Sequence, residues 1–370
     1  METKLVRIAE ISATSKHPIF TSVYHLINED MLKQCHKELD GNKAVGIDKV
    51  TKDEYGKNLD RNIKELVQRL KNKSFKPLPS LRVYIPKGNG KKRPLGIASY
   101  EDKIVQMAVK KILGAIYEPR FLNCMYGFRP NRGCHEAIKE VYQRISYGKI
   151  SYIVDADIKG FFDHIDHDWM MKFLEWNIQD KNLLWLIRKY LKAGIMEQGK
   201  FEPTEEGSAQ GSAMSPMLAN IYMHHVLTLW FKLVVQREMQ GECFLVNFAD
   251  DFVAGFQYKS EAERYYKELK ERMEKFEQKV RAYKNWIYDN RNRPMREIIK
   301  ELNVKLIGHY RYYGVTWNFR KITTFLHRVQ QFLFKAMNRR GCRRAYTWNG
   351  FVEMLKYYPL AKPKTYYCLY

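Results

Sequence analysis

The alternation of apolar and polar positions predicts short strands in three places. Residues 81–97, "LRVYIPKGNGKKRPLGI", indicate a hairpin, because two runs of β-forming residues flank a Gly-Asn-Gly turn. Residues 151–158, "SYIVDADI", indicate a strand that ends in carboxylates. Residues 245–256, "LVNFADDFVAGF", indicate a strand, a tight turn and a second strand. We therefore expect a small antiparallel sheet.

Apolar residues at helical spacing cover much of the remaining chain. They occur over residues 25–75, with a break at the turn cluster "DGNKAVGID", and over 101–118, 168–194 and 217–235. A long helical pattern then runs from Ser260 to about Asn290, and the rest of the chain is helical and basic. Helices packed on one face of a small antiparallel sheet make an α+β core, which an all-α module follows here.

Charge indicates the kind of partner. The 370 residues carry a formal net charge of +23, which points to a polyanion, most simply nucleic acid. Residues 277–370 hold 20 Lys and Arg against 5 Asp and Glu, and aromatic residues are interleaved with this charge, as in "RRGCRRAYTW". A candidate RNA-binding surface is therefore the basic cluster Arg339, Arg340, Arg343 and Arg344. The alternative is a soluble basic protein without such a partner.

The sequence gives little support to a membrane or secreted protein. No run of about 18 uninterrupted apolar residues occurs, and "METKLVRIAE" lacks the apolar core of a signal peptide. The six cysteines include no Cys-x-x-Cys pair. We therefore expect no zinc site, and reduced thiols in the cytoplasm.

Acidic residues stand at the ends of the predicted strands. Asp155 and Asp157 share one face of their strand by its two-residue period, and Asp250 and Asp251 lie in the predicted hairpin turn. If the two segments lie side by side, Asp157, Asp250 and Asp251 converge at one edge of the sheet. Divalent metal would neutralise them, and a pair of Mg²⁺ ions would activate a 3′-hydroxyl and stabilise a pyrophosphate leaving group. The alternative is a plain Asp-Asp turn.

A series of motifs resembles the reverse transcriptases of the group II intron type. The motifs are "YIPKGNGKKRPLGI", "YGFRPNRGCHEAI", "DADIKGFFDHIDH", "GSAQGSAMSPMLANIYMH", "NFADDFV" and "KLIGHYRYYG". In that order they resemble the fingers hairpin, the segment after it, the first catalytic strand, the nucleotide loop with its helix, the second catalytic strand and the thumb. The set is specific as a whole, although each motif alone is not.

The resemblance assigns roles to individual residues. Metal ligands would be Asp157, Asp250 and Asp251, together with the backbone carbonyl of Ile158. Lys87 and Arg93 match fingers residues that hold the incoming triphosphate, or else belong to a solvated basic hairpin. Phe162 matches the aromatic residue that blocks a 2′-hydroxyl and so selects deoxynucleotides, with core packing as the alternative. Gln210 and Gly211 match a loop that contacts the nucleotide, or else form a helix-entry turn.

The resemblance also implies an architecture and an activity. Residues 1–40 would be a helical extension, 41–150 the fingers, 151–276 a palm shortened at its C-terminal end, and 277–370 a basic helical thumb or maturase domain. The implied activity is RNA-directed DNA polymerisation with two Mg²⁺ ions, a template such as intron RNA, a DNA primer and deoxynucleoside triphosphates. The alternatives are an RNA-binding maturase or scaffold with a weak or vestigial polymerase site, and a domesticated or defence-associated reverse transcriptase.

The chain departs from this family after the second catalytic strand. The family continues through a helix, a strand bearing a Lys, and a Leu-Gly-Phe hairpin that holds the primer end. Here "SEAERYYKELKERMEKFEQKVRAYKNWIYDN" leads straight from the helix into thumb-like sequence. The usual primer-holding hairpin is therefore missing, which keeps the scaffold alternative open.

Overall fold

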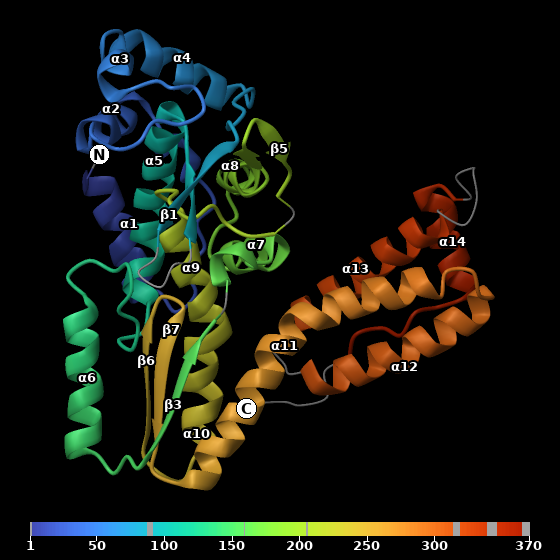
Figure 1. The fold of residues 1–370 in the computed structure, drawn as a ribbon. Helices are drawn as coiled ribbons and strands as arrows, with labels where there is room; N and C mark the ends of the chain where they lie inside the picture. The colour runs from blue at the N-terminus through green and yellow to red at the C-terminus, as the bar shows by residue number, and fades with distance from the viewer. Residues whose placement is uncertain are drawn as a thin grey trace. The chain divides into compact units, whose positions relative to one another are not determined.

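The computed structural model describes residues 2–86, 92–158, 160–204, 206–313, 319–338 and 346–364. The chain divides into two compact units, Met1–Tyr266 and Lys267–Tyr370 (Figure 1). The boundary between them falls inside a single long helix. The finer division into extension, fingers, palm and thumb stays a prediction from the sequence.

Helices surround the sheets of the first unit. They are α1 (Glu2–Thr14), α2 (Glu29–Glu38), α3 (Lys52–Gly56), α4 (Leu59–Lys71), α5 (Tyr100–Tyr117), α6 (Cys134–Tyr147), α7 (His167–Glu175), α8 (Lys181–Leu191), α9 (Ser215–Met223) and α10 (Gln236–Glu238). The helix predicted over 101–118 is α5. The Ser99 side chain caps its N-terminus by accepting a hydrogen bond from the Asp102 backbone N–H. Its apolar residues, such as Ile104 and Ile112, are fully buried. The predicted helical segment 168–194 is two helices, because Asp180 caps the start of α8.

The predicted hairpin at 81–97 is confirmed, but it belongs to a larger sheet than expected. Strands β1 (Ser80–Pro86) and β2 (Lys92–Ile97) pair antiparallel, and a short hairpin of β4 (Ile195–Glu197) and β5 (Lys200–Glu202) joins β1 through a parallel pair. Glu197 fixes this junction by accepting hydrogen bonds from Tyr84 at 2.7 Å and Arg82 at 3.3 Å. Strands as short as β4 and β5 show too little alternation to be found from sequence.

A second sheet carries the predicted acidic strand ends. Strand β3 (Tyr152–Asp157) pairs antiparallel with β7 (Asp251–Phe256), which pairs antiparallel with β6 (Cys243–Phe248). One face of this sheet packs against helical residues, as predicted, but Ala137 of α6 packs against Phe244 and Val246 of β6 on the other face. The ring of Phe256 on β7 lies 6.3 Å from the ring of Phe231 and 5.0 Å from the ring of Tyr265.

One described helical run is long and apolar enough to cross a membrane. It is Ser215–Glu238, which joins α9 to α10 through two π-helical segments. However, 67% of its most apolar window is buried inside the protein, and Leu218, Ile221 and Leu227 have no exposed surface. Packing within the first unit therefore accounts for its hydrophobic character.

The second unit is all-α, as predicted. Its helices are α11 (Lys259–Asp289, which begins in the first unit), α12 (Met295–Tyr313), α13 (Phe319–Met337) and α14 (Trp348–Tyr357). Helix α11 runs for 31 residues without a break, which confirms the continuous pattern expected from Ser260 to about Asn290. The core of the unit is formed by buried residues of all four helices, among them Ile287, Leu302, Leu333 and Phe351.

Candidate active site

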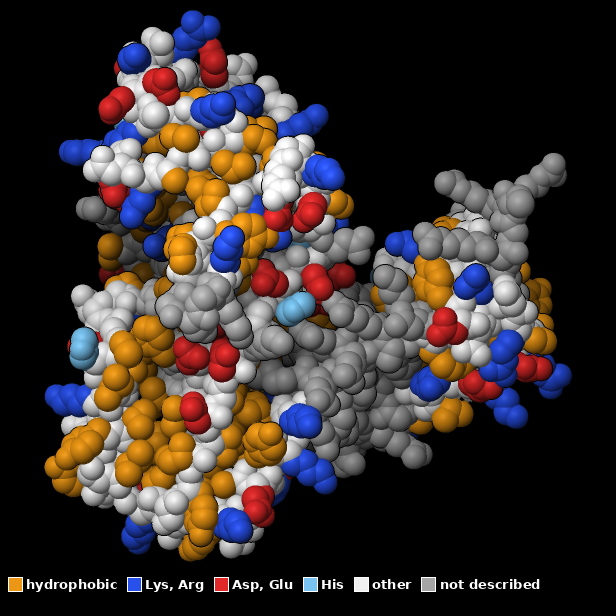
Figure 2. All heavy atoms as spheres, viewed as in Figure 1, with side chains coloured by type: hydrophobic (Ala, Val, Ile, Leu, Met, Phe, Trp, Pro, Cys, Tyr) orange, Lys and Arg blue, Asp and Glu red, His pale blue; other side chains and the backbone are white. Residues whose placement is uncertain are grey.

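The acidic residues singled out from the sequence meet at one end of the three-stranded sheet. The register of β3 and β7 sets Asp157 opposite Asp251, and Asp250 lies in the turn between β6 and β7. Asp155 shares the face of Asp157 two residues earlier. Figure 2 shows acidic side chains grouped over this part of the sheet, on a face otherwise formed largely by hydrophobic ones. Asp250 is half-buried and Asp251 is exposed, so the group opens to solvent.

The neighbouring carboxylates raise the cost of ionising Asp251. Partial burial raises the pKa of Asp251 above its ordinary value, and the charges of Asp250, Asp157 and Asp155 raise it further. Ionisation of Asp251 is therefore more costly than that of an isolated carboxyl, and positive charge nearby would lower that cost. A divalent cation held between the strands would supply that charge.

The turn that carries Asp250 is held by its neighbours. Ala249 has a φ of 60°, a left-handed conformation that costs a non-glycine residue about 1–3 kcal/mol. The buried Asn247 side chain donates hydrogen bonds to the carbonyl oxygens of Ala249 at 2.8 Å and Asp251 at 3.3 Å. These bonds tie together the two sides of the turn and fix the position of Asp250.

Residues 124–127 support the same turn from outside the sheet. The backbone N–H of Tyr126 donates to the carbonyl oxygen of Asn247 at 2.8 Å, and Asn247 donates back to this segment at 2.7 Å. Gly127 lies so close to the backbone of Ala249 that a Cβ atom at Gly127 would overlap it. The strained turn is thus enclosed by a second, hydrogen-bonded segment.

Arg129 serves the fold, a point that the motif "GFRP" alone does not decide. Its side chain is 6% exposed, and its Nε donates to a Glu118 carboxylate oxygen at 2.6 Å. Its Nη1 donates to the carbonyl oxygens of Leu122 at 2.9 Å and Met125 at 3.0 Å. These bonds anchor the segment that supports the acidic turn.

The chain turns sharply after β3. Gly160 has a φ of 65°, and the carbonyl oxygen of Ile158 accepts the Phe161 N–H at 3.2 Å, which leaves it a second lone pair. Phe162 is 9% exposed, and its ring lies edge-on to those of Phe161 at 5.5 Å and Phe128 at 6.4 Å. Phe162 is therefore a buried side chain beside the acidic strand end, and its role in selecting the sugar stays a prediction.

The loop with Gln210 and Gly211 connects the two sheets. The backbone N–H of Ser208 donates to the carbonyl oxygen of Phe162 at 2.7 Å. The backbone N–H of Gly96 on β2 donates to the carbonyl oxygen of Gln210 at 2.5 Å. Gly211 has a φ of 105°, and a Cβ atom there would lie 2.9 Å from the Gly96 carbonyl oxygen. Glycine is therefore required at 211, and the loop holds the β1–β2 hairpin close to the turn after β3.

The predicted cationic groups are only partly placed. Arg93 is exposed on β2, opposite Ile85 and on the strand that Gly96 fastens to the loop. Lys87 lies outside the described residues, as does the cluster Arg339, Arg340, Arg343 and Arg344. The roles of all these residues stay predictions.

The strand-end carboxylates fit a magnesium ion. In the described part of the chain, no group of three or more His, Cys, Asp or Glu side chains forms a ready-made metal cage. Mg²⁺ in nucleotide-binding sites takes one or two protein carboxylates and keeps water and substrate phosphates as its other ligands. A donor set of oxygens alone also favours Mg²⁺ or Mn²⁺ over zinc.

Comparison with known proteins identifies the family. The family described as reverse transcriptase (RNA-dependent DNA polymerase) matches residues 85–311. The chain belongs to the reverse transcriptase family. The match runs from the end of β1 into α12, so the three-stranded sheet, the acidic strand end and the Gln210–Gly211 loop lie inside it.

Relatives place the chain with the group II intron type. The group II intron-encoded protein LtrA of Lactococcus lactis subsp. cremoris is 38% identical over 238 residues, which are 63% of this chain and 39% of that protein. An uncharacterized 91 kDa protein in the cob intron of Schizosaccharomyces pombe is 37% identical over 204 residues, or 54% of this chain and 25% of that protein. This reverse transcriptase-family chain thus spans well under half the length of these two relatives.

The solved structures include a distant likeness, a partial Cas6-RT-Cas1–Cas2 complex. Its TM-score is 0.37 at 17% identity, and the match covers 69% of this chain and 42% of that one. The fold class follows from the family and from the structure itself: a reverse transcriptase core with small antiparallel strand pairs, followed by helices. The segment in which the sequence predicts no primer-holding hairpin forms the uninterrupted helix α11.

Proposed function

We propose that the chain is an RNA-directed DNA polymerase that extends the 3′-hydroxyl of a DNA primer on an RNA template. The supporting observation is the meeting of Asp157, Asp250 and Asp251 at one end of a sheet, where partial burial and then repulsion raise the pKa of Asp251. Like charges held together by a strained, well-supported turn destabilise the free protein. They are useful to a site whose substrate arrives with divalent cations.

The metal would supply the chemistry, and the protein the positions. When bound, a pair of Mg²⁺ ions would lower the pKa of the primer hydroxyl and neutralise charge on the departing pyrophosphate. Asp157, Asp250 and Asp251 would hold the ions, with the second lone pair of the Ile158 carbonyl as a further ligand. Asn247 keeps the acidic turn in one conformation, so little reorganisation would be needed when the substrates bind.

The incoming nucleotide would lie between the β1–β2 hairpin and the acidic strand end. Arg93, with Lys87 at the hairpin, would hold the triphosphate through charge-assisted hydrogen bonds. Gln210 and Gly211 would contact the nucleotide from the loop that joins hairpin and sheet. Phe162 would form the wall against a ribose 2′-hydroxyl, and its contact with Phe161 and Phe128 would keep that wall rigid.

A second role, as an intron-RNA maturase or RNA-binding scaffold, is favoured by a different observation. Helix α11 continues where the family has its primer-holding hairpin, and residues 277–370 hold 20 Lys and Arg against 5 Asp and Glu. Such a region would bind RNA phosphates whether or not the polymerase site is efficient. We propose that the chain holds a structured RNA in the cytoplasm and polymerises DNA on it.

Primer extension tests the polymerase proposal. Purified protein with Mg²⁺ and dTTP should lengthen an oligo-dT primer on poly-rA, and Asp157→Asn should abolish this. The matched control is Asp155→Asn, which removes a charge from the same strand face but no proposed ligand, and should extend at close to the wild-type rate. Inactive wild-type protein that still binds RNA would leave the scaffold role as the function. Full activity of Asp157→Asn would refute the metal assignment.

A further inference from the structure

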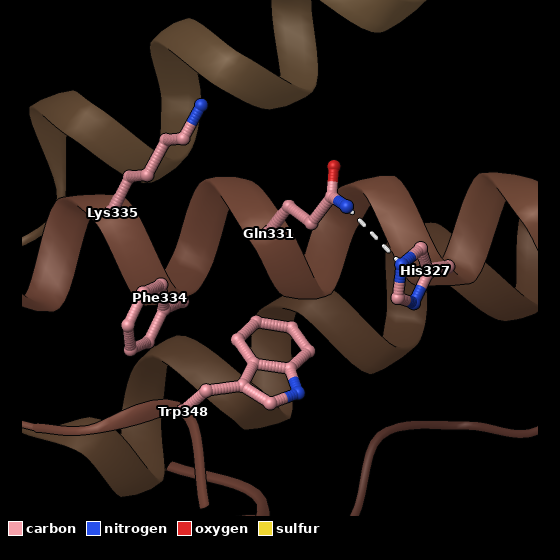
Figure 3. Close-up of a pocket in the computed structure, with 5 residues that line it drawn as sticks. All are labelled: His327, Gln331, Phe334, Lys335 and Trp348. Atoms are coloured by element: carbon pink, nitrogen blue, oxygen red, sulfur yellow. Dashed lines mark hydrogen bonds between the residues drawn. The ribbon is translucent and has the colours of Figure 1, made fainter.

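The second unit contains a pocket that the polymerase proposal does not use. It lies between α13 and α14, has a volume of about 430 Å³, and is lined by His327, Gln331, Phe334, Lys335 and Trp348 (Figure 3). Four of these residues come from three successive turns of α13, and Trp348 opens α14. We call this site the Trp348 pocket.

The aromatic side of the pocket is built and anchored. The Trp348 ring lies 5.1 Å from that of Phe334, at 80° to it, and 5.6 Å from that of Phe351. Phe351 is fully buried in the core of the unit, and Thr347 caps α14 by accepting the Gly350 N–H. The indole is therefore fixed from behind, yet 38% of Trp348 is exposed. A rigid and partly open aromatic face is a stacking platform.

The polar side of the pocket offers groups that can form hydrogen bonds with the edge of a flat, polar ligand. The Gln331 amide nitrogen lies 3.1 Å from His327 Nε2, and Figure 3 shows the two side chains pointing toward each other beside the indole. Lys335 follows one turn after Gln331, and its ammonium group extends away from the aromatic rings. The pocket thus combines a stacking surface, amide and imidazole groups at the ligand's edge, and a cation close by.

We propose that the Trp348 pocket binds an unpaired base of single-stranded RNA. The base would stack on the indole, its edge would meet Gln331 and His327, and Lys335 would contact a neighbouring phosphate. This inference rests on the RNA-holding part of the proposed function. It adds a place where the protein distinguishes unpaired from paired RNA.

Charge decides between RNA and a protein segment as the occupant. The surrounding residues 277–370 carry 20 Lys and Arg against 5 Asp and Glu, which favours a polyanion. Four arginines, at 339, 340, 343 and 344, stand in the sequence between Lys335 and Trp348.

The test compares single-stranded RNA with a perfect RNA duplex of equal length, by fluorescence anisotropy. Trp348→Ala should weaken single-strand binding about tenfold, because stacking of one base is lost, and should leave duplex binding unchanged. Trp348→Phe should restore most of the affinity. The control is Tyr357→Ala, which removes an 81% exposed aromatic ring of the same helix outside the pocket and should have no effect.

Salt dependence separates stacking from charge. Lys335→Ala should lower the slope of log affinity against log salt by about one unit, whereas Trp348→Ala should leave the slope unchanged. Irradiated RNA that contains thiouridine should crosslink to the peptide that holds Trp348. Because the crosslinking experiment uses the wild-type protein, it tests the proposed RNA contact even if Trp348→Ala disturbs folding.

Several outcomes would overturn the proposal that the Trp348 pocket binds an unpaired base. They are an equal loss on single strand and duplex, an equal loss in Tyr357→Ala, or no crosslink to the Trp348 peptide from RNA that the protein binds. The polymerase proposal is tested separately. Protein that fails primer extension but shows the Trp348 pattern refutes only the polymerase, and protein that extends primers without the pattern refutes only the pocket.

Discussion

The end of the three-stranded sheet and the region of residues 277–370 carry opposite charge, although both are proposed to meet nucleic acid. At the sheet end, Asp155, Asp157, Asp250 and Asp251 face one another without a cationic side chain in the register of β3 and β7. Residues 277–370 hold 20 Lys and Arg against 5 Asp and Glu. In the proposed function, the acidic site would meet phosphate through metal, whereas the basic region would bind phosphate directly.

This contrast assigns catalysis to the acidic site and RNA binding to the basic region in the proposed function. A basic side chain in place of the carboxylates would bind the substrate strongly but could not position divalent ions at the reacting atoms. Carboxylates in the basic region would repel the RNA. If the two regions work in this way, substitutions in one should change rate and substitutions in the other should change affinity.

The largest effect is expected from Asp250→Asn. Primer extension should fall by at least about 100-fold, the size of loss seen when one electrostatic group is removed from a reacting centre. RNA affinity should stay at the wild-type value, because Asp250 touches no phosphate directly. The variant should also melt at a higher temperature without metal, since one source of repulsion on Asp251 is gone. A parallel loss of RNA affinity would contradict the assignment of catalysis and RNA binding to separate regions.

The reciprocal experiment alters the basic region. Replacement of Arg339, Arg340, Arg343 and Arg344 by alanine should lower the slope of log affinity against log salt by up to about three units. The loss should be similar on unrelated RNAs if these residues contact only phosphate, and larger on one structured RNA if they form a maturase surface. Salt titrations on an intron-like and a random RNA measure it. An unchanged slope on both would make the cluster a solvated face.

A smaller effect is expected on the choice of sugar. Phe162→Val should relax discrimination against ribonucleotides by about tenfold, because the wall against a 2′-hydroxyl becomes smaller. The matched control is Phe173→Val, which shortens a buried ring that packs on Tyr222 and has no role in the proposed wall. Single-nucleotide incorporation of rNTP and dNTP gives the ratio. Equal selectivity in both variants would return Phe162 to a packing role alone.

The smallest effect concerns a carboxylate that the fold itself accommodates. Asp102 is buried and accepts hydrogen bonds from Ser99, Leu78 and Tyr190, yet burial raises its pKa from 3.8 to about 6. Its protonated form stabilises the fold below the ordinary pKa, and this stabilisation is lost as pH rises through about 6. Relative to Asp102→Asn, the wild-type free energy of unfolding should fall by up to about 3 kcal/mol over that window. Urea unfolding at several pH values measures the difference, and parallel curves would contradict it.

Local pattern was sufficient for several elements. The hairpin at 81–97, helix α5, the strand–turn–strand at 245–256 and the unbroken α11 all follow from the period of apolar residues and from turn residues. The acidic residues at the strand ends were visible for the same reason, since charge stands out in an apolar run. These features depend on residues within a few positions of one another.

Only the tertiary structure decided which residues meet. The pairing of Asp157 with Asp251 depends on the register of strands far apart in the chain. The role of Arg129 depends on carbonyl oxygens that a folded loop turns toward it, and the place of β4 beside β1 depends on Glu197. The Trp348 pocket exists only because α13 and α14 pack together. Such contacts depend on how the whole chain packs. A local sequence pattern therefore does not predict them.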